Sequence, residues 1–236
     1  MPSSPITSYS SSINLSRGSS TFSADLKPYQ PLESDLNSAF KSIDNILTNQ
    51  TRAIAHLAAQ YRKSKWSIEQ MKSSLLILND SLNKGGKIVV SGMGKSFKIA
   101  TKTVATLNSL GLHSASLHPS EALHGDLGMI REDHNDSLII ISASGNSPEL
   151  NLMLNYIPIT IPIVLVTCTK ISSLASNKRI SSVLYAELPS HLNEKSIYGL
   201  SAPTISTTLC LTLLDAVSIS LSELNIKDIN ARKSIF

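Results

Sequence analysis

The sequence has little cysteine, no block of like charges and no long uninterrupted apolar run. Its only two cysteines, Cys168 and Cys210, each lie in an apolar stretch. A scaffold held together by disulfides needs a much higher density of cysteine, so this chain is expected in a reducing compartment. The start of the chain also lacks the charged segment and apolar block of a secretory signal. These absences together favour the cytoplasm.

Charge and hydropathy exclude two classes of partner. The 21 Lys and Arg and the 17 Asp and Glu leave a net charge of +4, and the basic residues are scattered. Proteins that bind nucleic acid usually concentrate basic residues in one run or on one face, so no nucleic-acid partner is expected. The longest apolar candidate, around residues 157–168, carries Pro158 and Pro162, whereas a membrane span needs about 18 apolar residues. That segment suits a buried strand better, and no membrane partner is expected.

What the sequence does contain is enough apolar material for one sizeable domain. Hydrophobic residues make up 42% and charged residues 16% of the 236 positions, a balance typical of a globular protein. Residues 1–33 differ, because they are rich in Ser, Pro and Gly and have few large apolar side chains. Such a segment buries too little surface to offset the entropy lost on ordering. We therefore predict a disordered tail over 1–33 and a single domain over 34–236.

The spacing of apolar residues predicts an α/β domain. Helical spacing runs over residues 36–59 and 65–82, a short β-branched run follows at 87–91, and strand-like and helix-like segments then alternate. The further strands are predicted near 112–117, 137–142, 161–167 and 182–187, and the further helices near 95–110, 147–156, 171–178 and 203–224. Strands that alternate with helices pair in parallel through right-handed crossovers. The predicted fold class is a doubly wound sheet of about five parallel strands flanked by helices, with N-terminal helices before it.

Ligands of such sheets bind at the carboxyl ends of the strands, where loops meet the N-termini of helices. The loops at that edge are 91–96, 118–129, 142–149 and 187–203. They are also the parts of the sequence with unusual polar content, so the functional residues are sought there.

The loop at 91–96 reads Ser-Gly-Met-Gly-Lys-Ser and lies between a strand and a helix. Glycine lets the backbone approach an anion, the helix N-terminus offers unpaired amides, and Lys95 adds a full positive charge. Ser91, Gly92 and Ser96 complete the candidate substrate contacts of this loop. A plain strand-to-helix turn with a solvated Lys95 is the alternative. The spacing fits neither a Walker A loop nor a dinucleotide-binding fingerprint.

The loop at 142–149 reads Ser-Ala-Ser-Gly-Asn-Ser-Pro-Glu and again lies between a strand and a helix. The hydroxyls of Ser142, Ser144 and Ser147, with backbone amides, can form a phosphate cradle. The alternative is ordinary helix capping by Ser147, with Pro148 at the first helical position. Both readings can hold together, because capping uses only one hydroxyl. Two anion-binding loops on neighbouring strand ends favour a phosphorylated small molecule as the ligand.

The loop at 118–129 contains two histidines and two acids, a composition that is unfavourable in a long loop unless it is used. Histidine is the side chain best suited to exchange a proton near neutral pH. We therefore expect His124 to take part in acid–base chemistry or to contact the substrate, with structural hydrogen bonding and metal binding as the alternatives. For His118 the structural role is the favoured one.

These loops together resemble the SIS (sugar isomerase) domain and, within it, the arabinose-5-phosphate isomerase family of the KpsF/GutQ type. The resemblance spans about residues 36–230 in the same order. Its most specific part is the loop at 118–129, because generic SIS domains lack it. The matching stretches are Ser-Gly-Met-Gly-Lys-Ser at 91–96, His-Pro-Ser-Glu-Ala-Leu-His-Gly-Asp-Leu-Gly-Met at 118–129, Ser-Ala-Ser-Gly-Asn-Ser-Pro-Glu at 142–149 and Gly-Leu-Ser-Ala-Pro-Thr-Ile-Ser-Thr-Thr at 199–208.

The resemblance implies an enzyme that interconverts D-ribulose 5-phosphate and D-arabinose 5-phosphate without a cofactor and assembles as a homotetramer. It also implies roles for single residues. Lys95 is similar to the family's catalytic loop lysine, and Glu149 and Glu194 are similar to its two catalytically relevant glutamates. His124 is similar to its substrate-contacting histidine, and His118 to one that can take an inhibitory zinc. The serines of the loop at 142–149 are similar to its phosphate cradle.

The sequence departs from the family pattern at several points. Asn146 stands where the family commonly has Glu, and Ser201 is one residue more than the usual Gly-Leu-Ala-Pro-Thr. The family's His-Pro-Gly-Gly stretch, which carries another catalytic histidine, is expected about where this sequence reaches Phe236. The given sequence contains neither this stretch nor the regulatory CBS pair that follows it in many bacterial members. These departures bear on whether the chain is fully active.

The chemistry of such a reaction fits the residues on its own terms. Moving a carbonyl between C1 and C2 of a sugar phosphate needs a base, a donor that stabilises the enediolate, and an anchor for the phosphate. Glu149 or Glu194 can serve as the base if partial burial raises its pKa. Lys95 can stabilise the enediolate, and His124 can move a proton to the sugar oxygens. The alternatives are a non-catalytic regulatory protein that binds a sugar phosphate, and a SIS isomerase of another sugar phosphate.

Overall fold

The computed structural model describes residues 30–235, so nearly all of the predicted tail lies outside the described residues. The chain divides into two units, Met1–Ser42 and Ile43–Phe236. In the first unit, the described residues hold the beginning of helix α1, Glu33–Lys63. The second unit holds the rest of α1 and all of the elements described below. The predicted domain boundary at residue 33 stays a prediction.

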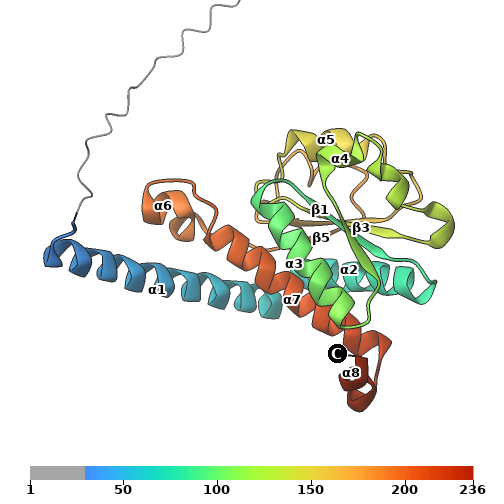
Figure 1. Ribbon diagram of the computed structural model, residues 1–236, viewed down its shortest axis with the longest axis horizontal. Coiled ribbons are helices and arrows are strands. Elements are labelled where there is room, and N and C mark those ends of the chain that lie inside the picture. Colours follow the sequence, from blue (N-terminus) through green and yellow to red (C-terminus); the bar gives the residue numbers. More distant parts are fainter. Residues whose placement is uncertain (1–29, 236) are drawn as a thin grey trace, which may run out of the picture. The chain divides into compact units, whose positions relative to one another are not determined.

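A sheet of five parallel strands forms the centre of the second unit, which confirms the predicted fold class (Figure 1). The strands lie in the order β2-β1-β3-β4-β5. The chain moves from β1 to one side of the sheet and then returns to the other side at β3. Ligands of doubly wound sheets bind at such a switch point, so the loops after β1 and β3 are well placed. The strands are β1 Ile88–Gly92, β2 Ser114–Leu117, β3 Ser137–Ile141, β4 Ile163–Thr167 and β5 Ser182–Tyr185.

Helices cover both faces of this sheet (Figure 1). Helices α2, α3 and α7 lie on one face, and the short helices α4 and α5 lie on the other. Each face therefore has its own apolar layer between strands and helices. The bounds of the helices are α2 Lys65–Asn83, α3 Lys95–Ser109, α4 Pro119–Ala122, α5 Pro148–Leu154, α6 Glu194–Tyr198, α7 Ile205–Asn225 and α8 Ile229–Ile235, with 3₁₀ turns at Asp126–Met129, Glu132–His134 and Ser190–Leu192.

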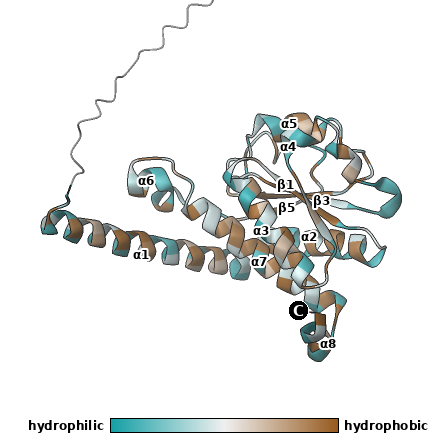
Figure 2. Cartoon of the chain, viewed as in Figure 1, coloured by the Kyte–Doolittle hydropathy of each residue, from teal (hydrophilic) through white to brown (hydrophobic). Residues whose placement is uncertain are grey.

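The strands form where they do because the sheet is buried on both faces. Val89 and Val90 are both fully buried, yet Val90 packs in the layer of α2, α3 and α7 and Val89 in the layer of α4 and α5. A strand buried on both sides needs apolar residues at consecutive positions, and β3 shows the same continuous burial. Figure 2 accordingly shows the strands among the most hydrophobic segments of the chain. Continuous apolar runs, rather than alternation, are therefore the sequence signal of this sheet.

The predicted helix over 171–178 is wrong. That segment forms turns, because its polar groups bond to the loop at 142–149 instead of to a helical ladder. The Ser173 hydroxyl donates to the Gly145 carbonyl at 3.1 Å, and the Ser173 amide donates to the Asn146 side chain at 2.9 Å. The Leu174 amide also bonds to the Gly145 carbonyl at 3.0 Å. Local side-chain to backbone bonds compete with helix formation in this way.

The longest apolar candidate is helix α7, and not the segment around residues 157–168 as expected from the sequence. By length and mean hydropathy, α7 alone among the described helices could cross a membrane. More than half of its apolar window, 56%, is buried in the fold. Leu209, Leu213 and Val217 belong to the core layer that this helix shares with α2 and α3. The core helix of a globular domain has the same composition, and the packing of α7 is of that kind.

A buried ion pair anchors the start of the sheet. Asp136 is 1% exposed and lies just before β3. One of its oxygens accepts the Lys87 ammonium at 2.5 Å and the Arg131 amide at 2.9 Å, and the other accepts the Lys87 amide at 2.9 Å. Burial by itself would raise the pKa of Asp136, but these hydrogen bonds and the Lys87 charge outweigh it and hold that pKa below its ordinary value. Asp136 therefore ties the entries of β1 and β3 together.

Candidate functional site

A polar cleft of about 530 Å³ lies at the carboxyl ends of β1, β3 and β4. Three of the four loops predicted to carry function meet there: those at 91–96, 142–149 and 187–203. The cleft sits beside the switch point of the sheet, where doubly wound folds bind ligands. Its lining residues are Met93, Lys95, Ser96, Ser142, Ala143, Ser144, Ser147, Cys168, Thr169, Leu188, Asn193, Glu194, Pro203, Ser206 and Thr207.

Lys95 stands at the first position of α3 and contributes the positive charge of the cleft. It is exposed, and it forms no ion pair with any of the described residues. Gly92 explains how the helix can begin so close to the strand. A Cβ at Gly92 would lie 2.8 Å from the Ser96 backbone, so only glycine permits this approach. Gly92 thus positions Lys95 and Ser96 by packing.

The serine loop after β3 presents its hydroxyls to the same cleft. Ser142 Oγ and Ser147 Oγ lie 3.0 Å apart, and the Gly145 amide donates to Ser142 Oγ at 3.1 Å. Ser144 Oγ accepts the Asn146 amide at 3.3 Å. Ser147 occupies the N-cap position of α5 with Pro148 directly after it, but its side chain makes no capping bond. The capping alternative therefore holds for the position of Ser147 and fails for its hydroxyl, which faces Ser142 in the cleft.

Gly145 is the one residue of this loop whose identity the backbone dictates. Its φ is +67°, in the left-handed region that favours glycine. A Cβ at this position would lie 2.1 Å from Ser172 Oγ and 2.6 Å from Ser172 Cβ. The loop after β3 thus folds tightly against the turn that follows β4.

Glu194 is buried, at 7% exposure, and opens α6. Its Oε1 accepts three hydrogen bonds: from the Thr204 amide at 3.1 Å, the Ser206 amide at 2.8 Å and the Ser206 hydroxyl at 2.6 Å. Burial by itself would raise the pKa of Glu194, but these hydrogen bonds, led by that from the Ser206 hydroxyl, outweigh it and lower that pKa below its ordinary value. The expectation that burial raises the pKa of Glu194 is therefore wrong, because the structure gives the opposite direction. Glu194 is held as a carboxylate at the start of α7.

Two of the predicted catalytic residues lie outside the lining of the cleft. Glu149 is half-buried in the first turn of α5, next to the serine loop. His124 is exposed and follows α4, in the loop after β2. Neither lines the polar cleft that holds Lys95 and Glu194. Their catalytic roles stay predictions.

His118 and Ser91 have structural contacts. His118 Nδ1 accepts the Ser120 amide at 3.3 Å and so caps α4, and its ring meets the ring of Phe97 edge-on at 4.8 Å. Ser91 is fully buried, and its hydroxyl points to Met153 Sδ at 3.9 Å, in the layer of α5. The described residues contain no group of three or more His, Cys, Asp or Glu that could hold a metal. The contacts of His118, a helix cap and a ring contact, support the structural role that the sequence favours for it.

Sequence reasoning missed five polar lining residues: Cys168, Thr169, Asn193, Ser206 and Thr207. Cys168 and Thr169 directly follow β4, so the rule that sites gather at carboxyl ends of strands could have found them. Thr207 lies in the first turn of α7, which the apolar pattern marks only as a core helix. No residue-type signal distinguishes it from the other threonines of that helix.

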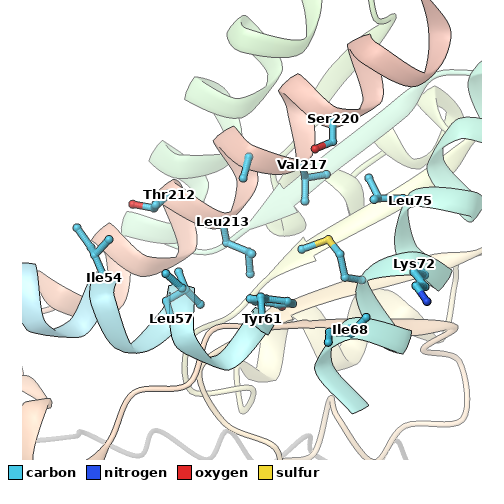
Figure 3. Close-up of a pocket in the computed structure, with 13 residues that line it drawn as sticks. Ile54, Leu57, Tyr61, Ile68, Lys72, Leu75, Thr212, Leu213, Val217 and Ser220 are labelled. Atoms are coloured by element: carbon cyan, nitrogen blue, oxygen red, sulfur yellow. The ribbon is translucent and has the colours of Figure 1, made fainter. Parts of the chain in front are cut away.

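A second cavity, of about 390 Å³, lies between α1, α2 and α7 (Figure 3). Leu57, Tyr61, Ile68, Leu213 and Val217 point into it, and its lining is almost wholly apolar. A sugar phosphate carries charge and many hydroxyls, and transfer of such groups into an apolar space is unfavourable. The polar cleft is therefore the candidate site for such a ligand.

Comparisons with known proteins identify the family of the chain. A family model described as the SIS domain matches residues 81–220. Arabinose 5-phosphate isomerase KdsD of Francisella tularensis is 35% identical over 183 residues, which are 73% of this chain and 53% of that protein. Arabinose 5-phosphate isomerase KpsF of Escherichia coli is 35% identical over 181 residues, which are 76% of this chain and 50% of that protein. The chain thus spans about half the length of these curated relatives.

Solved structures show the same fold. A protein of Escherichia coli CFT073, whose structure was solved in complex with A5P, is 28% identical to this chain. The two structures superpose with a TM-score of 0.65 over 86% of this chain and 98% of that one.

Proposed function

This chain belongs to the SIS domain family, and on that premise we propose that it is an aldose–ketose isomerase that interconverts D-ribulose 5-phosphate and D-arabinose 5-phosphate through an enediol intermediate. The observation that carries the proposal is the polar cleft, in which a cationic side chain, a serine loop and an ionised carboxylate face one space. Relatives named arabinose 5-phosphate isomerase and a structural neighbour solved with A5P support the choice of substrate.

The phosphate is anchored by the serine loop. Ser144 and Ser147 donate hydroxyl hydrogen bonds to the phosphate oxygens, and Ser142 holds Ser147 in place through their 3.0 Å contact. Lys95 and Ser96, on the neighbouring loop, line the same cleft. The ammonium of Lys95 is free of ion pairs with described residues and is directed to the oxygens at C1 and C2, where negative charge develops in the enediolate.

The proton moves between C1 and C2 on a carboxylate. Glu194 is the weaker candidate for this base, because three hydrogen bonds on Oε1 lower its pKa and stabilise its charged form. We assign it to orient Lys95 and the substrate hydroxyls. Glu149 is the proposed base, since it directly follows the serine loop at the start of α5. His124 exchanges a proton with the sugar oxygens when the loop after β2 closes over the bound sugar.

The expected setting of this activity is a homotetramer in the cytoplasm, with no cofactor. A shared site would explain why Glu149 and His124 lie apart from the cleft within one chain. Light scattering of the purified full chain should therefore give four times the mass of one chain. A fully active monomer would remove the shared site.

The test of the function is an incubation of the purified chain with ribulose 5-phosphate, followed by chromatography of the products. Arabinose 5-phosphate should form without added nucleotide or metal, and Lys95→Met should abolish its formation while the fold is kept. If ribulose 5-phosphate raises the melting temperature but no product forms between about pH 6 and pH 9, the chain is a sugar-phosphate-binding regulatory protein. If six- or seven-carbon phosphates turn over faster, it is an isomerase of another sugar phosphate.

A further inference from the structure

The two cysteines of the chain, 42 positions apart in sequence, meet beside the cleft. Cys168 Sγ and Cys210 Sγ lie 3.8 Å apart, and both thiols are free. Cys168 directly follows β4, and Cys210 lies in the second turn of α7. Because the whole sequence holds only these two cysteines, each is the other's sole thiol partner within one chain.

The two sulfurs differ in their access to solutes. Cys168 lines the polar cleft and is partly exposed, whereas Cys210 is 1% exposed. Cys168 Sγ also lies 3.9 Å from the Ser206 carbonyl, one helical turn before Cys210. A small polar solute that enters the cleft therefore reaches Cys168 first and finds Cys210 directly behind it.

We propose that Cys168 and Cys210 are a redox site, at which hydrogen peroxide converts the dithiol into a reversible disulfide. In the first step the Cys168 thiolate attacks one peroxide oxygen, the O–O bond breaks, and Cys168 becomes a sulfenic acid while one water leaves after proton uptake. In the second step the Cys210 sulfur attacks the Cys168 sulfur, the S–O bond breaks, and a second water leaves. Two thiols and one peroxide thus give one disulfide and two waters.

The roles of the two sulfurs follow from their surroundings. The hydrogen bond with Cys210, burial and the nearby charge of Glu194 raise the pKa of the Cys168 thiol. The thiolate is the nucleophile, so its small population limits the rate at neutral pH. Below that raised pKa the rate should increase about tenfold for each unit of pH. A buried partner sulfur at 3.8 Å then favours the disulfide over further oxidation of Cys168.

Disulfide formation would change the cleft. An S–S bond is about 2.05 Å long, so the Cys168 and Cys210 sulfurs must approach each other from the present 3.8 Å. Cys168 forms one wall of the cleft, and Ser206, on the same face of α7 as Cys210, holds Glu194. The bond therefore repositions the Cys168 side chain in the lining and ties it to the helix that holds Glu194, and we infer that the oxidised chain binds ribulose 5-phosphate more weakly. This consequence, unlike the disulfide itself, rests on the proposed function.

The reduced full chain, treated with hydrogen peroxide and separated from excess oxidant, tests the first part. Intact mass should fall by about 2 Da, both thiols should become unreactive after denaturation, and dithiothreitol should reverse both changes. The rate should rise between pH 7 and pH 9. A gain of one or more oxygens on Cys168, a disulfide between two chains, or no change of mass would each overturn the proposal.

Variants identify the sulfurs and test the effect on the cleft. Cys210→Ala and, independently, Cys168→Ala should each lose the 2 Da change, and a melting curve shows which of them is folded. Calorimetry with ribulose 5-phosphate should give a dissociation constant at least about threefold higher for the oxidised than for the reduced wild type. A disulfide that leaves this constant unchanged would overturn the coupling to the cleft. If neither form binds ribulose 5-phosphate, the proposed function and the coupling both fail, whereas the mass measurement still decides the redox site.

Discussion

The amide and the hydroxyl of Ser206 both donate to a single oxygen of Glu194, at 2.8 and 2.6 Å. This contact joins two parts of the chain that the sequence keeps apart, the polar loop at 187–203 and the start of the apolar helix α7. Together with the Thr204 amide, it satisfies donors at the N-terminus of α7 that would otherwise lack partners. Glu194 therefore has a structural task in addition to the catalytic role proposed for it.

We predict that Glu194→Gln lowers the free energy of unfolding at pH 7 by about 1–2 kcal/mol, because hydrogen bonds to a charged acceptor become bonds to a neutral one. The folded pKa of Glu194 lies below its ordinary value of 4.5. Its contribution to stability is therefore fully present above about pH 4.5 and is lost as the pH falls through the folded pKa. Urea unfolding of both proteins at pH 7 and at pH 3 should show the difference at pH 7 and a smaller one at pH 3.

Glu149→Gln is the matched control for stability, since it removes a charge near a helix start without three converging hydrogen bonds. Its free energy of unfolding should change by less than about 0.5 kcal/mol. An equal loss in both variants would show that charge alone, and not the contact with Ser206, determines the loss of stability.

The turnover of Glu194→Gln should fall only mildly if Glu194 orients Lys95.

For Glu149→Gln we predict that turnover falls by about two to four orders of magnitude while substrate affinity changes little. The substitution keeps size and hydrogen bonding but removes the basic lone pair. Incorporation of solvent deuterium at C2 of the recovered sugar reports the proton transfer directly and should fall in parallel. Near-wild-type exchange in both this variant and Glu194→Gln would show that neither carboxylate is the base.

Ser144→Ala should weaken binding of ribulose 5-phosphate by about 1–2 kcal/mol, which is about fivefold to thirtyfold in the dissociation constant. Ser144 is exposed and its hydroxyl accepts only the Asn146 amide within the loop, so the fold should be unaffected. Ser109→Ala is the control, because Ser109 is an exposed serine at the opposite end of α3 from Lys95. Calorimetry should find it unchanged. Unchanged affinity in both Ser144→Ala and Ser147→Ala would remove this loop from the site.

Asp136→Asn should destabilise the chain by about 3 kcal/mol at pH 7, because it leaves Lys87 without its buried counter-ion. Since the folded pKa of Asp136 is also lowered, this contribution is present above its ordinary value of 3.8 and is lost as the pH falls below it. Glu69→Gln is the control, because its pair with Lys72 is exposed and should contribute less than about 0.5 kcal/mol. A similar loss in both variants would show that burial of the Asp136 pair has no special effect.

The sheet could be predicted from the sequence because strands buried on both faces require continuous apolar runs. The segment at 171–178 could not, since its hydroxyls and its Leu174 amide bond to a loop that is remote in sequence. Ile171, the first residue of that segment, is 87% exposed and provides no buried helix face. Helix α6 was likewise hidden inside the loop at 187–203, because a five-residue helix leaves no periodic signal.

The candidate site was predictable as far as topology dictates it. Lys95 and the serine loop follow adjacent strands, so parallel pairing alone brings them to one edge. The direction of the Glu194 pKa could not be foreseen, because it depends on Ser206, twelve residues further along the chain. The contact between Cys168 and Cys210 was hidden for the same reason, since it arises only when α7 packs beside β4.

Gly145 limits how the serine loop after β3 can vary. A left-handed backbone and a side chain 2.1 Å away exclude every residue with a Cβ at this position, whereas the exposed Ser144 has no such limit. In a library that randomises the loop one position at a time, glycine alone should survive at 145, and many residues should survive at 144 when selection is for folding only. Gly145 thus determines the path of the backbone, whereas the side chain at position 144 determines which groups the loop presents. Ligand preference in this domain is therefore free to drift by exchange of single hydroxyls, with no need to invent a new loop.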